Sequence, residues 1–318
     1  MATHSIEPTR AHLHGHFSAA LPPILTIEPG DTVRFHTLDA GWRLEPPRLD
    51  GSSPRMLEPR DDKLDAGHAL CGPLAIRGAR PGMALEIRMD AIEPEAWGWT
   101  RSGGWKSPIN DRLGVADGAG HWLIWTIDAA RKVARDQHGH EVSLRPFMGV
   151  MGLAPAERGV HSTIPPRASG GNIDCKELVA GSTLFLPIAV NDALFSVGDG
   201  HATQGDGEVS GLAIECPMRR VELTFALRDD LGLRLPMAET PAGTVTLGFG
   251  ATLDDAAGDA LDAMVHVIGA RFGVSRKDAL ALASVAVDLR VTQVVNQVVG
   301  VHAVLPPDAI RGGAPRRA

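Results

Sequence analysis

The 318-residue chain is 44% hydrophobic and carries a formal net charge of −7, so it can bury a sizeable core and lacks the basic excess of nucleic-acid binders. Its odd set of three widely spaced cysteines predicts neither a disulfide framework nor a CxxC metal site, so we expect reduced thiols in a cytoplasm. No apolar run approaches the roughly 20 residues of a membrane helix, and the polar N-terminus lacks a signal's apolar core. We therefore expect neither a membrane nor a nucleic-acid partner.

The first 250 residues carry the signals of short strands joined by turns. Gly and Pro number 36 and 23, which favours turns between strands over a helical bundle. A Gly-containing turn precedes or separates apolar, β-rich runs in residues 25–35, 78–89 and 178–190. Alternating apolar residues predict further strands over residues 121–127, 207–214 and 220–227. Residues 43–63 and 97–120 are rich in Pro, Gly or charge, and we expect long surface loops there.

Helical spacing of apolar residues begins only after residue 252. It predicts a helix over 253–272 between an N-cap at Thr252 and a C-cap at Gly273. Ser275 and Asp278 predict the start of a second helix over 276–287, and residues 288–299 are predicted as a strand. We expect a mainly β fold of β-sandwich or barrel-like units with a smaller C-terminal α+β part. The expected divisions are an N-terminal β-rich domain (1–145), a central β domain with the active-site motifs (146–250) and a C-terminal segment (251–318).

The densest polar stretch is residues 198–208, where glycines separate side chains of the metal-ligand and acid–base types. Those side chains are Asp199, His201, Gln204, Asp206 and Glu208. Glycine lets the backbone turn sharply and approach a ligand closely, while carboxylates and imidazole suit a divalent cation or proton transfer. The alternative is a solvated Gly-Asp turn. A second Gly-rich stretch, residues 169–174, adds Asn172 and Asp174.

Histidines at positions 12, 14 and 16 form a second candidate cluster. Alternate residues of a strand share a face, so His12, His14 and His16 together suit zinc, although a polar surface strand would show the same pattern. His68 is a lone candidate of a kind that is more often structural.

Motifs of a side-chain nucleophile are missing from the sequence. There is no G-x-S-x-G elbow, and Cys175 follows Asp174, whose carboxylate disfavours a thiolate. A metal-activated water fits this inventory of residues better.

Several blocks spread in order along the chain resemble the acetamidase/formamidase family. They are PPILTIEPGDTV at 22–33, GPL at 72–74, GARPG at 78–82, GVMGLAPA at 149–156, GGNID at 170–174, GDGHATQGDGE at 198–208 and VAVDLRVTQVV at 285–295. The resemblance implies a mostly β fold, hydrolysis of a short linear amide to carboxylate and ammonia, and a homo-oligomer. It also implies a bound divalent metal. Residues 42–63 and 97–121 resemble the family less, so the resemblance implies a short amide without deciding between formamide, acetamide and a related compound.

These observations lead to a hypothesis for the site. Asp174, Asp199 and His201 hold a divalent cation, Zn²⁺ as the first expectation and Ca²⁺ as a structural ion, with His14 and His16 as further ligand candidates. Glu208 acts as general base, Asp206 is a further catalytic candidate, and Gln204 or Asn172 holds the amide or its oxyanion. Two alternatives stay open: a non-catalytic β-sandwich module with structural Ca²⁺ loops, and a hydrolase of a urea- or carbamate-like compound.

Overall fold

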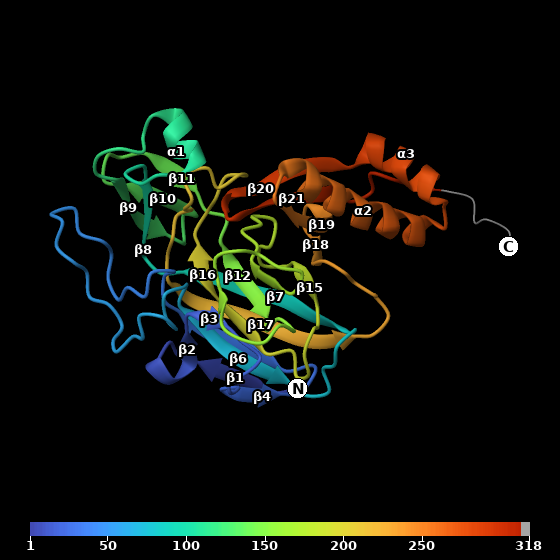
Figure 1. Ribbon diagram of the computed structural model, residues 1–318, viewed down its shortest axis with the longest axis horizontal. Coiled ribbons are helices and arrows are strands. Elements are labelled where there is room, and N and C mark those ends of the chain that lie inside the picture. Colours follow the sequence, from blue (N-terminus) through green and yellow to red (C-terminus); the bar gives the residue numbers. More distant parts are fainter. Residues whose placement is uncertain (313–318) are drawn as a thin grey trace.

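Two large, mostly antiparallel sheets pack against each other in the computed structural model, which describes residues 1–312 (Figure 1). In the larger sheet only the pairing of its first two strands is parallel. Its strands, in spatial order, are β1 (Thr3–Ile6), β5 (Thr32–Thr37), β17 (Met218–Arg228), β7 (Ala84–Pro94), β15 (Thr183–Pro187), β18 (Met237–Thr240), β19 (Gly243–Gly250), β21 (Val298–Leu305) and β20 (Asp288–Asn296). Because this sheet takes strands from all three expected domains, their boundaries stay a prediction.

The second sheet carries most of the candidate site. Its strands, in order, are β14 (Gly170–Asn172), β12 (Phe147–Leu153), β16 (Phe195–His201), β6 (Leu70–Ile76) and β2 (Leu13–His14), with β4 (Leu25–Ile27) parallel beside β6. A short pair, β13 (His161–Ser162) and β3 (His16–Phe17), and a 3-10 turn, η1 (Arg10–His12), flank it.

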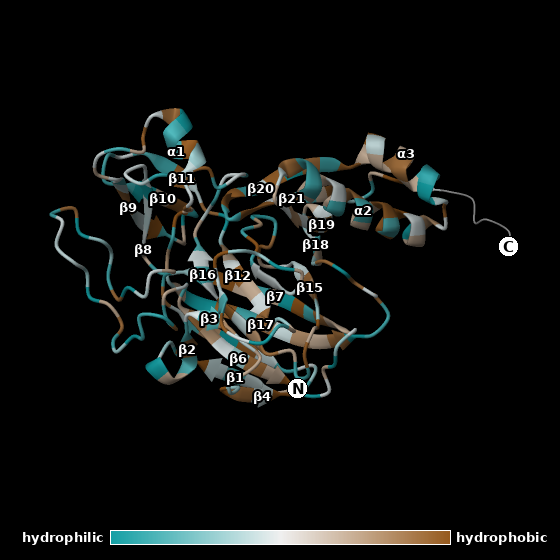
Figure 2. Cartoon of the chain, in the orientation of Figure 1, coloured by the Kyte–Doolittle hydropathy of each residue, from teal (hydrophilic) through white to brown (hydrophobic). Residues whose placement is uncertain are grey.

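One apolar core joins the two sheets. Val33, Ile87 and Leu223 of the larger sheet belong to the same buried cluster as Leu74 and Met148 of the second. The rings of Phe195 on β16 and Phe225 on β17 lie 5.1 Å apart across the interface. Along β7 and β17 of the larger sheet, hydrophobic and hydrophilic residues alternate, as expected when one face of a sheet is buried (Figure 2). Strands β6, β12 and β16 of the second sheet are buried at every residue. The expected mainly β, sandwich-like fold is confirmed.

Both predicted C-terminal helices are present, and the first of them packs against β19 and β21 at the end of the larger sheet. Helix α2 (Leu253–Phe272) begins at Thr252, whose side chain accepts a hydrogen bond from the Asp255 N–H, and ends at the left-handed Gly273. Helix α3 (Arg276–Ala286) begins at Ser275 and ends one residue earlier than predicted. Gly248 on β19 lets α2 lie close, because a Cβ there would come within 2.0 Å of the Ala256 carbonyl oxygen.

A third, smaller sheet stands beside the body (Figure 1). Its strands, in order, are β11 (Glu141–Ser143), β10 (Val133–Asp136), β9 (His121–Asp128) and β8 (Trp97–Ser102), with helix α1 (Pro108–Leu113) after β8. The prediction of a loop over 97–120 is therefore wrong. Glycines hid the alternation of Trp97, Trp99 and Arg101, and β8 is held by pairing along β9 over its whole length. The loop predicted over 43–63 contains no strand or helix.

Three further local predictions are corrected. Residues 207–214 are not a strand, because Gly207, Glu208 and Gly211 have positive φ and turn the backbone. The strand predicted over 288–299 is split into β20 and β21 by Gln297, whose φ is 68°. Finally, the histidines at 12, 14 and 16 do not share one strand, since η1 ends at the first and Gly15 separates the other two. No helix within residues 1–312 is long and apolar enough to cross a membrane.

Candidate functional site

The site is built around His201, the last residue of β16. Asp199 lies two residues earlier, so both side chains leave the strand on the same face. The Nε2 atom of His201 lies 3.4 Å from Oδ1 of Asp199, and both side chains are buried. Strand pairing explains why both residues are buried, because β16 lies between β6 and β12 in the interior of its sheet.

Asp174 reaches the same point from the loop after β14. Strand β12 lies between β14 and β16, and the Asp174 N–H donates to the carbonyl of Gly149 on β12 at 3.3 Å. This brings Oδ1 of Asp174 to 4.0 Å from Nδ1 of His201. Gly149 is required here, since a Cβ would lie 2.5 Å from Oδ2 of Asp199 and 2.7 Å from Oδ1 of Asp174. The glycine thus leaves the space that the two carboxylates enclose.

Two glutamates complete the group. Glu215 pairs as an isolated bridge with both His201 and Trp99, and its Oε1 lies 3.3 Å from Nε2 of His201. Glu208 lies in the positive-φ turn and is also buried. Atoms of His201, Glu208 and Glu215 that could bind a metal ion lie within 4.8 Å of one another, and the same holds for Asp174, Asp199 and His201.

The sequence reasoning missed Glu215. It lies in the otherwise apolar run Ala213-Ile214-Glu215-Cys216, outside the Gly-rich stretch. The sequence signal that could have found Glu215 is its position as a single ionisable residue between apolar neighbours. Apolar neighbours indicate burial, and a carboxylate is seldom buried without a charged partner or a metal.

Four buried carboxylates around one imidazole perturb one another's ionisation. Burial raises the pKa of Asp174 to about 8 and that of Glu215 to about 7, although His201 opposes both shifts. Burial, and next the charge of Asp174, raises the pKa of Glu208 well above its ordinary value. Burial lowers the pKa of His201, but Glu215 and Asp199 outweigh it and raise that pKa well above the ordinary value. Without a cation, the group therefore holds protons in place of part of its negative charge.

The residues present fit a divalent cation. Oδ1 of Asp174, Oε2 of Glu208 and Oε2 of Glu215 are buried oxygens without a hydrogen-bond partner in the described part of the chain. Leaving such atoms unpaired is costly, and a cation would satisfy them. Carboxylate oxygens together with one imidazole nitrogen form a ligand set of the kind that holds zinc and related ions.

Two amide side chains hold these groups in place. Gln204 accepts from Nδ1–H of His201 at 3.0 Å and donates to the Asp174 carbonyl oxygen at 2.8 Å. With Nδ1 engaged by Gln204, Nε2 of His201 faces Asp199 and Glu215. Asn296, at the end of β20, donates to Oδ2 of Asp174 at 2.5 Å. Gln204 was expected to contact the substrate, but both ends of its amide are already engaged, and Asn296 was not expected at all.

The other predicted residues lie outside this group. Asp206 is exposed and pairs with Lys176 at 2.8 Å. Asn172 lies on β14 with a buried, unpartnered Oδ1 among residues 1–312. His14 hydrogen bonds to the His16 carbonyl and to Ser196, and His16 to the Leu64 carbonyl. Among the described residues, neither His14 nor His16 belongs to a group whose ligand atoms lie close enough to share an ion. The structure therefore does not bring these two histidines to the site.

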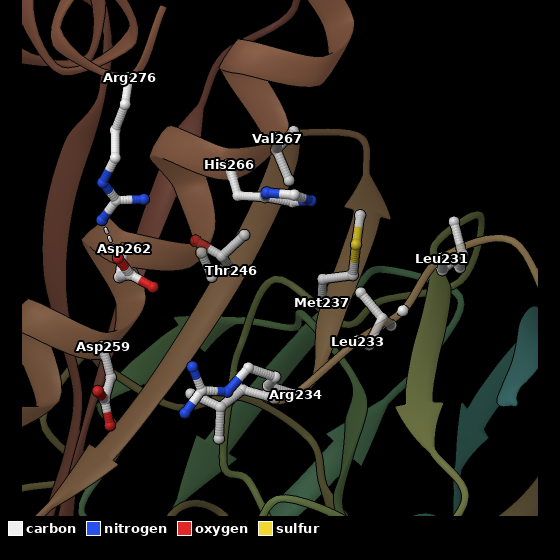
Figure 3. Close-up of a pocket in the computed structure, with 13 residues that line it drawn as sticks. Leu231, Leu233, Arg234, Met237, Thr246, Asp259, Asp262, His266, Val267 and Arg276 are labelled. Carbon is white, nitrogen blue, oxygen red and sulfur yellow. Dashed lines mark hydrogen bonds and ion pairs between the residues drawn. The ribbon is translucent and has the colours of Figure 1, made fainter. Parts of the chain in front are cut away.

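A cavity of about 230 Å³ adjoins the site at Gln204 and Glu208. Its other walls are mainly apolar and include Trp125, Val142 and Ile214. A separate pocket of about 390 Å³ lies between α2 and the segment that joins β17 to β18, and its lining includes none of the site residues (Figure 3).

Comparison with known proteins was made on sequence and on structure. The sequence model of the acetamidase/formamidase family matches residues 2–162 and 156–310. A formamidase of Methylophilus methylotrophus is 25% identical over 260 residues, which is 62% of this chain and 60% of that protein. The chain thus spans about three fifths of the length of that relative.

Two solved structures share the architecture. An acetamidase of Bacillus halodurans superposes with a TM-score of 0.79 at 28% identity, covering 94% of this chain and 96% of the other. A protein of Thermoanaerobacter tengcongensis superposes with a TM-score of 0.83 at 24% identity over 96% of each chain, which shows the same fold.

Proposed function

Because the chain belongs to the acetamidase/formamidase family, we propose that it hydrolyses the C–N bond of a small linear amide to a carboxylate and ammonia. The observation that carries this proposal is the buried group of Asp174, Asp199, His201, Glu208 and Glu215, which has unpartnered carboxylate oxygens and reaches a small cavity at Glu208. A non-catalytic β-sandwich that binds a structural cation would need these carboxylates but would have no need of the adjoining cavity.

We propose that Asp174, Asp199, His201 and Glu215 hold a divalent cation, with Glu208 beside it. The imidazole favours Zn²⁺ over Ca²⁺, which prefers a shell of oxygen atoms. When bound, such an ion supplies Lewis acidity: it polarises an amide carbonyl and lowers the pKa of a coordinated water.

Glu208 is proposed as the proton carrier. Hydrolysis adds the oxygen of water to the amide carbon, breaks the C–N bond and releases ammonia, so one proton must move from water to nitrogen. The unpartnered Oε2 of Glu208 can take that proton and deliver it, and Glu208 also lines the cavity. Asp206 is not retained in this role, because it is exposed and paired with Lys176.

The amide group of the substrate needs hydrogen-bond partners in the site. Oδ1 of Asn172 is a buried acceptor without a partner in residues 1–312, but Asn172 does not line the cavity beside Glu208, so its contact with the substrate amide stays a prediction. Gln204 positions His201 and Asp174 instead of contacting substrate. The modest, mostly apolar cavity suits a short acyl group.

The test is ammonia release from a panel of small amides, ureas and carbamates. We expect activity on formamide, acetamide or a close relative, loss of activity after exhaustive chelation, and recovery with Zn²⁺. Glu208→Gln, which keeps the shape but removes the proton carrier, should lower kcat by about 10²-fold or more.

The matched control is Glu95→Gln, an exposed glutamate outside the site, which should keep wild-type turnover. Full activity of a verified metal-free enzyme would overturn the metal assignment. Ammonia release from ureas or carbamates but not from amides would favour the alternative of a urea or carbamate hydrolase. If chelation lowered Tm and no compound on the panel were hydrolysed, the alternative of a non-catalytic module with structural Ca²⁺ would be favoured. The homo-oligomeric state and the cytoplasmic location stay predictions.

A further inference from the structure

One face of the small sheet forms a wall of the cavity beside Glu208. Thr100 on β8, Trp125 on β9 and Val142 on β11 line this cavity, and the rest of its lining comes from the segment 203–214. Residues paired across neighbouring strands share a face of a sheet, and by this pairing the three side chains lie on the same face. The small sheet therefore shapes the space beside the proposed proton carrier.

Hydrogen bonds fix the indole ring of Trp125 in this wall. Its Nε1–H donates to Oγ1 of Thr100 at 3.1 Å, and the Thr100 hydroxyl donates to the Ala213 carbonyl oxygen at 2.6 Å. The Ala213 N–H in turn donates to Oε1 of Glu215 at 3.0 Å. Trp125 is only 6% exposed. The ring is thus a fixed surface, connected through two residues to a proposed ligand of the cation.

Backbone contacts set the distance between the small sheet and the site. The N–H groups of Trp99 and Glu215 each donate to the other's carbonyl oxygen at 2.9 Å. Gly98 permits this close approach, because a Cβ there would lie 2.7 Å from Cγ2 of Ile214. The position of the wall relative to the site is therefore fixed by the fold.

The cavity is larger than the smallest amides need. An apolar cavity of about 150 Å³ is enough to hold benzene. The cavity beside Glu208 measures about 230 Å³, which leaves room for an amide group with an acyl chain of about four carbons. Each methylene buried against an apolar wall favours binding by about fourfold. A chain that outgrows the cavity meets the fixed ring of Trp125.

The lining also selects against a negatively charged acyl group. Among the described residues that line the cavity there is no Lys or Arg, and the charged ones are Asp206 and Glu208. Lys176, which pairs with Asp206, is not part of the lining. A carboxylate on the acyl chain would meet like charge and no cationic side chain in this cavity. A neutral acyl group fits it.

We propose that Trp125 is the specificity-determining residue of the site and selects neutral aliphatic amides with acyl chains of up to about four carbons. This inference rests on the proposed amide hydrolysis and adds the class of amide. Thr100 is a positioning residue, since its hydroxyl holds the Trp125 ring.

The test is kcat/KM for the straight-chain amides from formamide to hexanamide, with succinamate as a charged member. In wild type, kcat/KM should rise by about fourfold per methylene from acetamide to butyramide and fall for longer chains. Succinamate should be at least about 10-fold poorer than butyramide. Trp125→Ala should raise the hexanamide-to-acetamide ratio of kcat/KM by about 10-fold or more, and Val142→Phe, which fills the cavity, should lower the butyramide-to-acetamide ratio by a similar factor.

The matched control is Trp97→Ala, a half-buried tryptophan on β8 outside the lining, which should keep the wild-type order of substrates. Binding of butyramide and hexanamide, measured by ligand-observed NMR on each protein carrying Glu208→Gln, reads the same preference without turnover. If Trp125→Ala does not fold, Val142→Phe decides the test.

The outcomes separate this inference from the proposed function. Amide hydrolysis with an order of substrates that neither Trp125→Ala nor Val142→Phe changes would overturn the role of Trp125 and leave the proposed function standing. No hydrolysis, with a binding preference that shifts in these variants, would overturn the proposed function alone. Neither hydrolysis nor a preference in binding would overturn both. An equal shift in Trp97→Ala would show that loosening the small sheet is sufficient, which rules against Trp125.

Discussion

At the scale of single residues, the site depends on a few side chains whose environment is unusual. Asp174, Asp199, Glu208 and Glu215 are carboxylates buried around His201. Like charges held together out of water destabilise the folded chain unless a proton or a cation compensates them. These buried carboxylates therefore lower the stability of the metal-free folded chain. We expect substitutions of these residues to raise stability while they lower activity.

Glu215→Gln is the substitution that tests this expectation. It removes a negative charge 3.3 Å from Nε2 of His201 without changing the side-chain shape. We expect the metal-free variant to melt above the metal-free wild type, because charge repulsion falls, and to lose about 10- to 100-fold in Zn²⁺ affinity or in kcat/KM. Calorimetry and amide hydrolysis measure the two effects.

Glu95→Gln, on the surface, serves again as the matched control and should change neither quantity. A lower Tm together with wild-type activity in Glu215→Gln would show that this glutamate is structural and does not serve the site.

At the scale of elements, β20 connects the C-terminal part to the site. The Gly207 N–H donates to the Thr292 carbonyl at 3.1 Å, and the Val294 N–H donates to the Gly207 carbonyl at 3.1 Å. The turn that carries Glu208 is thus attached to the side of β20, and Asn296 at the end of the strand holds Asp174. The C-terminal α+β part therefore helps to shape the site and is not only an appendage to the β body.

Asn296→Ala should show this connection. Without its donor, Oδ2 of Asp174 is free to turn away, so we expect Zn²⁺ affinity to fall by about 10- to 100-fold. Competition with a chromophoric chelator measures this affinity, and added Zn²⁺ should restore kcat. Asn191→Ala, an exposed asparagine, is the control. Wild-type Zn²⁺ affinity in Asn296→Ala would contradict a positioning role.

At the scale of the whole molecule, buried histidines make the fold sensitive to acid. Burial lowers the pKa of His14, where β2 joins the second sheet, to about 4. Burial likewise lowers the pKa of His302 on β21 to about 4. An unfolded histidine has a pKa near 6.5, so between about pH 6.5 and 4 the unfolded chain binds more protons. Stability is full above this window and falls as the pH drops through it.

His14→Asn should lessen this acid sensitivity. From the two pKa values, His14 alone should lower the free energy of unfolding by about 2 kcal/mol between pH 7.5 and pH 5.0. The variant should lose stability at pH 7.5, since Ser196 loses its partner, but its further loss on going to pH 5.0 should be smaller. Urea unfolding at the two pH values measures both. The same pH-dependent loss in both proteins would contradict the assignment to His14.

The sequence by itself determined the features that depend on neighbours along the chain. The caps at Thr252, Gly273 and Ser275 set the helix ends, because capping is a contact over three or four residues. The dense Gly-rich stretch 198–208 marked Asp199, His201 and Glu208 as candidates, and the ordered family blocks indicated an amide hydrolase. Local pattern failed at residues 97–120, where glycines masked β8, and at 207–214, where positive φ values broke an apparent strand.

Only the tertiary structure decided which distant residues meet His201. Glu215 and Asn296 arrive there through strand pairing and through β20, and neither has a neighbouring motif that predicts it. The same long-range packing engaged His14 and His16 elsewhere, although their spacing resembled a zinc site. Hydrogen bonds between residues more than a hundred positions apart depend on the order of strands in the sheets, and a linear pattern does not contain that order.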